Sequence, residues 1–180
     1  MISTKNASSF DADPYRSRVL QVQARSHFDV GGWHSIVAVT LTLKQAIQQH
    51  GYVFYGREEN YTKVFECFMR RLNRAVYGNA ARRFERRLRV IPIIEKDEDG
   101  RWHIHAAIET PAHMSPWQFR NEIMRCWPTK NLWAYKFNQI KFGADVGWVN
   151  YLLKLRQKSG LEAWSDSIDW YSFYNPIVDG

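Results

Sequence analysis

The chain has 180 residues, of which 45% are hydrophobic and 15% aromatic, and its 25 Lys and Arg against 18 Asp and Glu give a formal net charge of +7. This composition predicts one folded domain with its own core and excludes a disordered chain. Two cysteines, Cys67 and Cys126, exclude a disulfide scaffold and a cysteine-rich zinc site, and no apolar run reaches the roughly 18 residues of a membrane span.

The positive charge is concentrated in one part of the chain. Every Lys and Arg lies at or before Lys158, whereas four of the acidic residues follow it. A basic body with an acidic tail favours a polyanion, such as nucleic acid, as the partner. We expect a partly disordered N-terminal extension over residues 1–30, a folded domain over 31–158 and an acidic C-terminal tail over 159–180.

The first half of the domain predicts a strand, a helix and a hairpin. Residues 35–43 (SIVAVTLTL) are mostly apolar or β-branched, which predicts a central strand. Apolar residues recur every three or four positions over 61–77, which predicts a helix with one buried face. Two strand-like runs, 88–96 and 101–109, flank the acidic sequence at 97–100, and this pattern predicts a β-hairpin.

The second half predicts a helix, a strand and a final helix. Ser115 followed by Pro116 favours a helix start, and the helix is expected to run to Cys126. Residues 132–142 predict a strand and residues 144–157 a helix. This order of elements predicts an α+β fold, in which a central antiparallel sheet of about five strands is backed by helices.

The hairpin carries a candidate metal site. His103 and His105 are two positions apart, so their side chains leave the same face of a strand. A three-residue loop with Gly100 in the left-handed position would pair Glu95 with His103 across the hairpin. One carboxylate and two imidazoles would then converge, which suits Mn²⁺ or Mg²⁺. A structural pair of histidines is the alternative interpretation.

The final helix carries a candidate nucleophile. Tyr151 and Lys154 are neighbours on one helix face, opposite the apolar stripe, and Lys158 lies beside them. A tyrosine hydroxyl, with a pKa near 10, needs a nearby ammonium group or metal before it can attack a phosphate. From this helix alone, a packed or surface tyrosine is the simpler interpretation.

Two further groups of residues are candidates for nucleic-acid binding. The segment before the hairpin is rich in arginine, and phosphate contact or simple solvation would each explain it. The basic candidates are Arg82, Arg83, Arg86, Arg87 and Lys158. Three alternating aromatic residues, Trp133, Tyr135 and Phe137, would either stack on bases or pack in the core.

Together these residues resemble the HUH endonucleases, and more narrowly the single-tyrosine, Rep-type initiators of rolling-circle replication. The sequence His-Ile-His at 103–105 matches their His-hydrophobic-His motif, and Glu95 stands where related Rep domains carry a third ligand. The sequence YLLK at 151–154 matches the YxxK motif of their nucleophile helix. The resemblance covers about residues 34–158, and no phosphate-binding loop of a helicase is visible.

This resemblance implies a ferredoxin-like or RRM-like fold and a nicking reaction on single-stranded DNA. Tyr151 would attack the scissile phosphate and stay joined to it as a 5′-phosphotyrosine, while Lys154 stabilises the developing charge. Glu95, His103 and His105 would hold the Mn²⁺ or Mg²⁺ ion. The implied partners are single-stranded DNA, including an origin stem-loop, and the host helicase and replication machinery. We expect a cytoplasmic location, or a nuclear one for a eukaryotic virus or element.

Two other functions fit part of the same evidence. A single-tyrosine HUH transposase would carry the same motifs in the same order. A non-catalytic, RRM-like nucleic-acid-binding module would share the order of strands and the exposed aromatic residues, but would have no need for the carboxylate, the histidines and the YxxK motif together.

Overall fold

The computed structural model describes residues 30, 32–97, 99–127, 132–145 and 147–149. The predicted acidic tail and all but the last residue of the predicted N-terminal extension lie outside the described residues, so the domain boundaries stay a prediction. Within the described ranges, no helix combines the length and the apolar character that a membrane span requires.

A four-stranded antiparallel sheet forms the centre of the fold. Its strands are β1 (Ile36–Thr42), β4 (Val90–Lys96), β5 (Trp102–Glu109) and β6 (Gln139–Ala144), arranged in the order β4-β5-β1-β6. The run of apolar and β-branched residues predicted as a central strand is β1, which pairs with β5 on one side and β6 on the other. The predicted α+β class is confirmed, and the described sheet has four strands where about five were expected.

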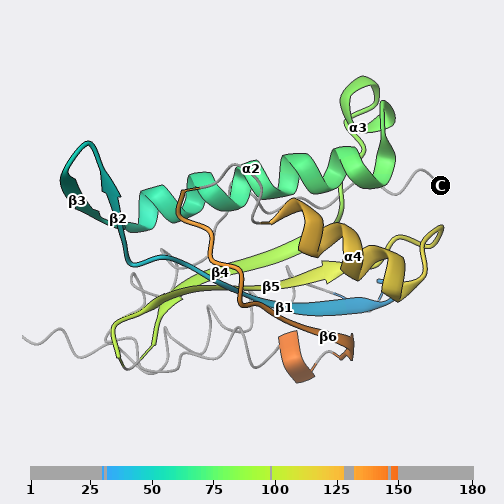
Figure 1. The fold of residues 1–180 in the computed structure, drawn as a ribbon. Coiled ribbons are helices and arrows are strands. Elements are labelled where there is room, and N and C mark those ends of the chain that lie inside the picture. The colour runs from blue at the N-terminus through green and yellow to red at the C-terminus, as the bar shows by residue number, and fades with distance from the viewer. Residues whose placement is uncertain (1–29, 31, 98, 128–131, 146, 150–180) are drawn as a thin grey trace, which may run out of the picture.

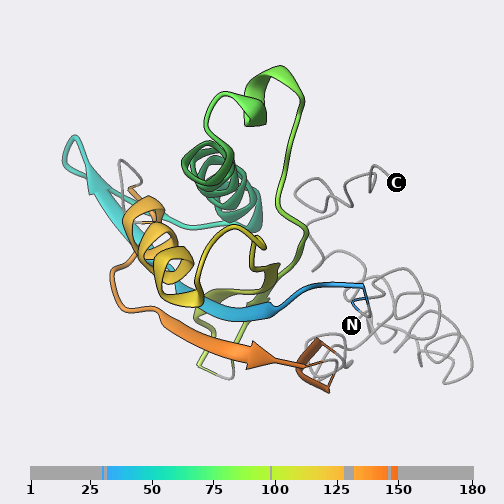
Figure 2. The same ribbon diagram turned by 90° about the vertical axis from the view of Figure 1, so that its right-hand side faces the viewer.

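Helices cover only one face of this sheet. The long helix α2 (Glu58–Tyr77) and the helix α4 (Pro116–Cys126) lie next to each other on that face, and the short α3 (Ala80–Arg83) follows α2 (Figure 1). The expected cap of α4 is present, because Gln118 N–H donates to the Ser115 hydroxyl. The helical turn at residues 147–149 lies on the opposite face (Figures 1 and 2).

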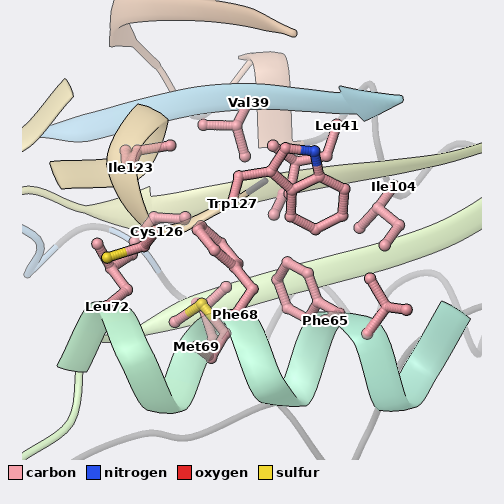
Figure 3. Close-up of a cluster of buried hydrophobic side chains, with 14 of the residues drawn as sticks. Val39, Leu41, Phe65, Phe68, Met69, Leu72, Ile104, Ile123, Cys126 and Trp127 are labelled. Carbon is pink, nitrogen blue, oxygen red and sulfur yellow. The ribbon is translucent and has the colours of Figure 1, made fainter. Parts of the chain in front are cut away.

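The main core fills the space between the sheet and the two helices. Val39, Leu41 and Ile104 project from the sheet towards Phe65, Phe68 and Leu72 of α2 (Figure 3). Trp127 closes the end of α4 and meets Phe68 edge to face at 5.4 Å. All of these side chains are fully buried, so the helix-covered face provides most of the hydrophobic stabilisation of the domain.

A second, two-stranded sheet was not predicted. Its strands β2 (Ala46–Gln49) and β3 (Tyr52–Tyr55) form a hairpin between β1 and α2. The two turn residues, His50 and Gly51, have φ angles of 51° and 81°, which is the backbone that a tight type I′ turn requires. The hairpin projects beyond the main sheet (Figure 1), and its aromatic residues are exposed.

The strand predicted at residues 132–142 is largely wrong. Strand β6 begins only at Gln139, and residues 132–138 contain a single bridge, between Ala134 and Leu43. Asn138 explains the break, because its side-chain oxygen accepts the N–H of Thr42 at 3.1 Å and so takes the place of a backbone partner. Further along, Gly143 has a φ of 64° where the register shifts, as in a β-bulge.

Candidate metal centre

The sheet face opposite the helices is divided into an apolar part and a polar part. Ile36, Ile91, Ile93 and Ala107 are buried there in a second, smaller cluster that includes Val30 and Val149. Further along the same face, the side chains become polar. The polar set consists of Thr40, Thr42, Glu95, His103 and His105, which are all at least partly exposed.

The predicted register of the hairpin is confirmed. Glu95 pairs with His103, and Lys96 with Trp102, across strands β4 and β5. The turn closes because Asp97 N–H donates to the Arg101 carbonyl at 2.9 Å, and Gly100 takes the expected left-handed conformation with a φ of 75°. The three proposed ligands therefore leave the same sheet face from adjacent positions.

The side chains pair differently from the prediction. The Oε1 atom of Glu95 lies 3.2 Å from Nε2 of His105, which is diagonal to it rather than directly opposite. His103 points its Nδ1 atom towards Asp97 Oδ2 at 3.6 Å. In the part of the chain that the structure describes, no three His, Cys, Asp or Glu side chains are already grouped as a metal site.

Thr40 fixes the orientation of the His105 ring. Its hydroxyl lies 3.0 Å from Nδ1 of His105 across the β1–β5 pairing. When Nδ1 carries the proton, the lone pair of Nε2 faces the carboxylate of Glu95. A lone pair and a carboxylate oxygen at this separation repel unless a proton or a cation lies between them, so this pair of atoms has the electronic character of a cation site.

The geometry of this pair suits a divalent ion. Two ligand atoms about 2.1 Å from one ion, at octahedral or tetrahedral angles, are about 3.0 to 3.4 Å apart. The Glu95–His105 separation of 3.2 Å falls within this range. The His103 ring, whose centroid lies 6.4 Å from that of His105, would complete a three-ligand set by turning away from Asp97. The residues present therefore fit Mn²⁺ or Mg²⁺.

The start of the last predicted helix lies on the same sheet face as the histidines. Asp145 caps it, because its side-chain and backbone oxygens accept the N–H of Trp148 at 2.9 and 3.0 Å. Val149 is buried against Ile91, Ile93 and Ala107 in the smaller cluster. The candidate residues Tyr151, Lys154 and Lys158 follow directly in sequence and lie outside the described residues.

Two tyrosines of the described part are unsuited to attack a phosphate. Tyr61 is fully buried on the helix side, and burial raises its pKa to about 12. Its hydroxyl donates to the Lys44 carbonyl at 3.1 Å. Burial, followed by the Glu109 carboxylate, also raises the pKa of Tyr77. A phenol with a raised pKa is less readily converted to the nucleophilic phenolate.

The candidate basic residues lie far from the histidines. Arg82 and Arg83 end α3, and Arg86 places its guanidinium 5.9 Å from the ring centre of Tyr77 at the end of α2. This segment leads into the beginning of β4, whereas Glu95 lies near the end of that strand, about 20 Å further along. Arg82, Arg83, Arg86 and Arg87 are all exposed, and they are not neighbours of the candidate metal centre.

The three alternating aromatic residues separate into two groups. Trp133 packs against the core and meets Tyr61 edge to face at 5.8 Å. Tyr135 and Phe137 are exposed, and their ring centres lie 5.3 Å apart. The prediction that such residues are core is therefore confirmed for Trp133 and wrong for the other two.

Sequence reasoning missed three residues of this face. Thr40 and Asp97 contact the two histidines, and exposed Lys141 of β6 is paired with Ala38, on the same face as Thr40. The alternation of β1 gave a signal for Thr40, since an isolated polar position in an apolar strand often faces a polar site. The other two depend on pairings between distant segments.

The comparison with protein families decides the relationship. Residues 36–160 match the model of a family described as replication-associated protein ORF2, which is more than half of the chain. The chain belongs to this family. Membership in the ORF2 family of replication-associated proteins agrees with a role as a replication initiator, as the resemblance implied. Neither the curated proteins nor the solved structures contain a match to this chain.

Proposed function

We propose that this member of the ORF2 family is a metal-dependent, site-specific endonuclease of single-stranded DNA. It nicks and rejoins one strand in rolling-circle replication of a plasmid, phage or mobile element, as a single-tyrosine HUH enzyme. One observation carries the proposal: Glu95 and His105 form a cation-like pair on the open sheet face, and the helix that leads to Tyr151 starts on that same face.

The chain's own residues divide the work of the reaction. Glu95, His103 and His105 would hold the divalent ion, which when bound polarises the scissile phosphate and offsets its charge. Thr40 keeps Nε2 of His105 directed at the ion position. His103 lies beside Asp97, which orients its ring in the absence of a cation.

Tyr151 supplies the nucleophile in this proposal. Its oxygen loses the phenolic proton and forms a bond to phosphorus, while the bond from phosphorus to the 3′ oxygen breaks. The products are a 5′-phosphotyrosine and a DNA strand that ends in a 3′-hydroxyl, which takes up a proton. Lys154, one helical turn from Tyr151, stabilises the phenolate. Because a phosphodiester is exchanged for another, rejoining needs no nucleotide triphosphate.

The covalent adduct provides the direct test. The full chain is mixed with pooled single-stranded oligonucleotides and Mn²⁺, and a protein band that survives boiling and is shifted by the mass of DNA is expected. Tyr151→Phe should abolish this band and leave DNA binding intact, while the matched variant Tyr171→Phe should retain it. Replacing both His103 and His105 by Ala should abolish cleavage.

Two results would contradict the proposal. A shifted band in Tyr151→Phe would place the nucleophile elsewhere. Binding of the oligonucleotides without any adduct, with either Mn²⁺ or Mg²⁺, would favour the non-catalytic nucleic-acid-binding module instead. The family of replication-associated proteins favours replication over transposition, and origin-dependent replication in cells would separate these two.

A further inference from the structure

Two adjacent aromatic rings are exposed at the end of strand β1. Tyr135 and Phe137 are 41% and 61% exposed, although each is a large side chain. Their ring centres are 5.3 Å apart and the ring planes are inclined by 56°. The ammonium of Lys136 lies 5.3 Å from the centre of the Phe137 ring. This combination of open aromatic rings and a positive charge is typical of surfaces that bind single-stranded nucleic acid.

Hydrogen bonds hold the backbone of this segment in place. Tyr135 N–H donates to the Thr42 carbonyl at 3.0 Å, and the Tyr135 carbonyl accepts the indole N–H of Trp127 at 2.9 Å. The Thr42 hydroxyl donates to the Phe137 carbonyl, and Thr42 N–H donates to the Asn138 side chain. The aromatic pair is therefore presented by a fixed segment, so little ordering is needed when a ligand binds.

Thr42 joins this segment to the candidate metal centre. In the β1–β5 pairing Thr42 lies directly opposite His103, so the two side chains share a face and their Cβ atoms are about 5 Å apart. The hydroxyl that contacts Phe137 therefore lies on the face of the histidines. A nucleotide next to a phosphate at His103 would come within reach of the Phe137 ring.

We infer that Tyr135 and Phe137 stack on bases of single-stranded DNA beside the scissile phosphate, with Lys136 contacting a neighbouring phosphate. This inference rests on the proposed function and adds the surface that holds the substrate strand. The candidate arginines lie at the other end of β4, so this surface provides base contacts where they do not reach. Stacking accepts every base, so these residues contribute affinity rather than sequence selectivity.

The experiment measures DNA binding without cleavage. The full chain is titrated in EDTA against a labelled oligothymidylate of about 30 nucleotides and against an oligonucleotide of equal length made only of abasic sites. Phe137→Leu should bind oligothymidylate about 5-fold to 100-fold more weakly and should bind the abasic strand as the wild type does. Phe137→Trp should restore the affinity. Lys136→Gln should reduce the salt dependence by about 0.7 in log Kd per log unit of salt.

Trp117→Ala provides the matched control. Trp117 is 66% exposed and lies at the start of α4, where it contacts Phe142 on the helix side of the sheet. Its replacement should leave both affinities unchanged. If Phe137→Leu binds oligothymidylate as the wild type does, or if both oligonucleotides lose affinity equally, the inference is overturned. A wild-type chain that binds both oligonucleotides with the same affinity overturns it too, without any substitution.

The same variants separate this inference from the proposed nuclease activity. Adduct formation by a chain whose DNA binding ignores Phe137 overturns the stacking surface and leaves the nuclease proposal standing. Binding that depends on Phe137 and on bases, without any adduct in Mn²⁺, supports the stacking surface and counts against the nuclease.

Discussion

The hydroxyl of Thr40 lies 3.0 Å from Nδ1 of His105, across two paired strands. This contact leaves Nε2 of the same ring facing Glu95 at 3.2 Å. A threonine on one strand thus sets the direction in which a histidine on the next strand presents its lone pair. Contacts of this kind commonly tune the affinity of a metal ligand.

Replacing Thr40 by Val tests this role, since the two side chains have nearly the same shape. The imidazole loses its only partner at Nδ1 that the structure describes, so Mn²⁺ affinity should fall about 10-fold to 100-fold. Thr40→Ser should restore most of it. Isothermal titration with Mn²⁺ measures the affinity, and DNA binding in EDTA should not change. Equal Mn²⁺ affinity in Val and wild-type chains would show that the hydroxyl has no positioning role.

Glu95→Gln removes a negative charge and keeps the size of the side chain. Because Mn²⁺ and Mg²⁺ prefer charged oxygen ligands, the Mn²⁺ concentration for half-maximal cleavage should rise at least about 10-fold. Glu122→Gln, on α4, should behave as the wild type because Glu122 pairs with Arg125 on the helix side. An unchanged Mn²⁺ requirement in Glu95→Gln would remove the carboxylate from the ligand set.

The buried phenol of Tyr61 predicts a loss of stability at high pH. Its pKa is raised from 10.0 to about 12 by burial, so above pH 10 the unfolded chain loses this proton while the folded chain keeps it. The contribution to stability is complete below pH 10 and is lost between pH 10 and 12, by up to about 1.4 kcal/mol per pH unit. Urea unfolding at several pH values should show a smaller fall in Tyr61→Phe than in the wild type.

Gly56 is predicted to be essential for the same buried ring. A Cβ atom at this position would lie 1.7 Å from the Tyr61 hydroxyl oxygen, so Gly56→Ala must displace a fully buried side chain. We expect a loss of about 1 to 3 kcal/mol in the free energy of unfolding, measured by urea titration. Gly32→Ala should be nearly neutral, since its nearest neighbour would be 4.0 Å away. Equal stability of the two variants would contradict the packing described.

The exposed arginines are predicted to act through charge alone. Because they lie at the opposite end of β4 from Glu95, replacing Arg82, Arg83, Arg86 and Arg87 by Gln should weaken DNA binding without changing the rate of adduct formation at saturating DNA. If all four contact phosphates, the slope of log Kd against log salt should fall by about 3. An unchanged slope would identify the segment as a solvated surface.

Local signals in the sequence were sufficient for several elements. The acidic turn ending in Gly100 determines the pairing of Glu95 with His103, because a short loop leaves one register. Ser115 and Pro116 specify the start of α4 for a similar reason, since the cap is formed within one helical turn. The hairpin turn at His50–Gly51 also carried a local signal, although His is a less typical turn residue than Asn or Asp and the hairpin was not predicted.

Contacts between distant segments could not be predicted in the same way. Asn138 ends the predicted strand by bonding to Thr42, which is 96 positions away, and nothing near Asn138 in sequence indicates this partner. The diagonal pairing of Glu95 with His105, and of His103 with Asp97, depends on side-chain rotamers. Backbone register places these groups on one face but leaves open which atoms meet.

The β4–β5 hairpin also restricts how the gene can diverge. Successive side chains of a strand point to opposite sides, so adding or losing one codon between Glu95 and His103 would turn the carboxylate away from the imidazoles. Two codons, or one codon absorbed as a bulge, would keep them together. Descendants that retain the activity should therefore show insertions and deletions here in pairs, while the loops on the helix side are free to vary by single codons.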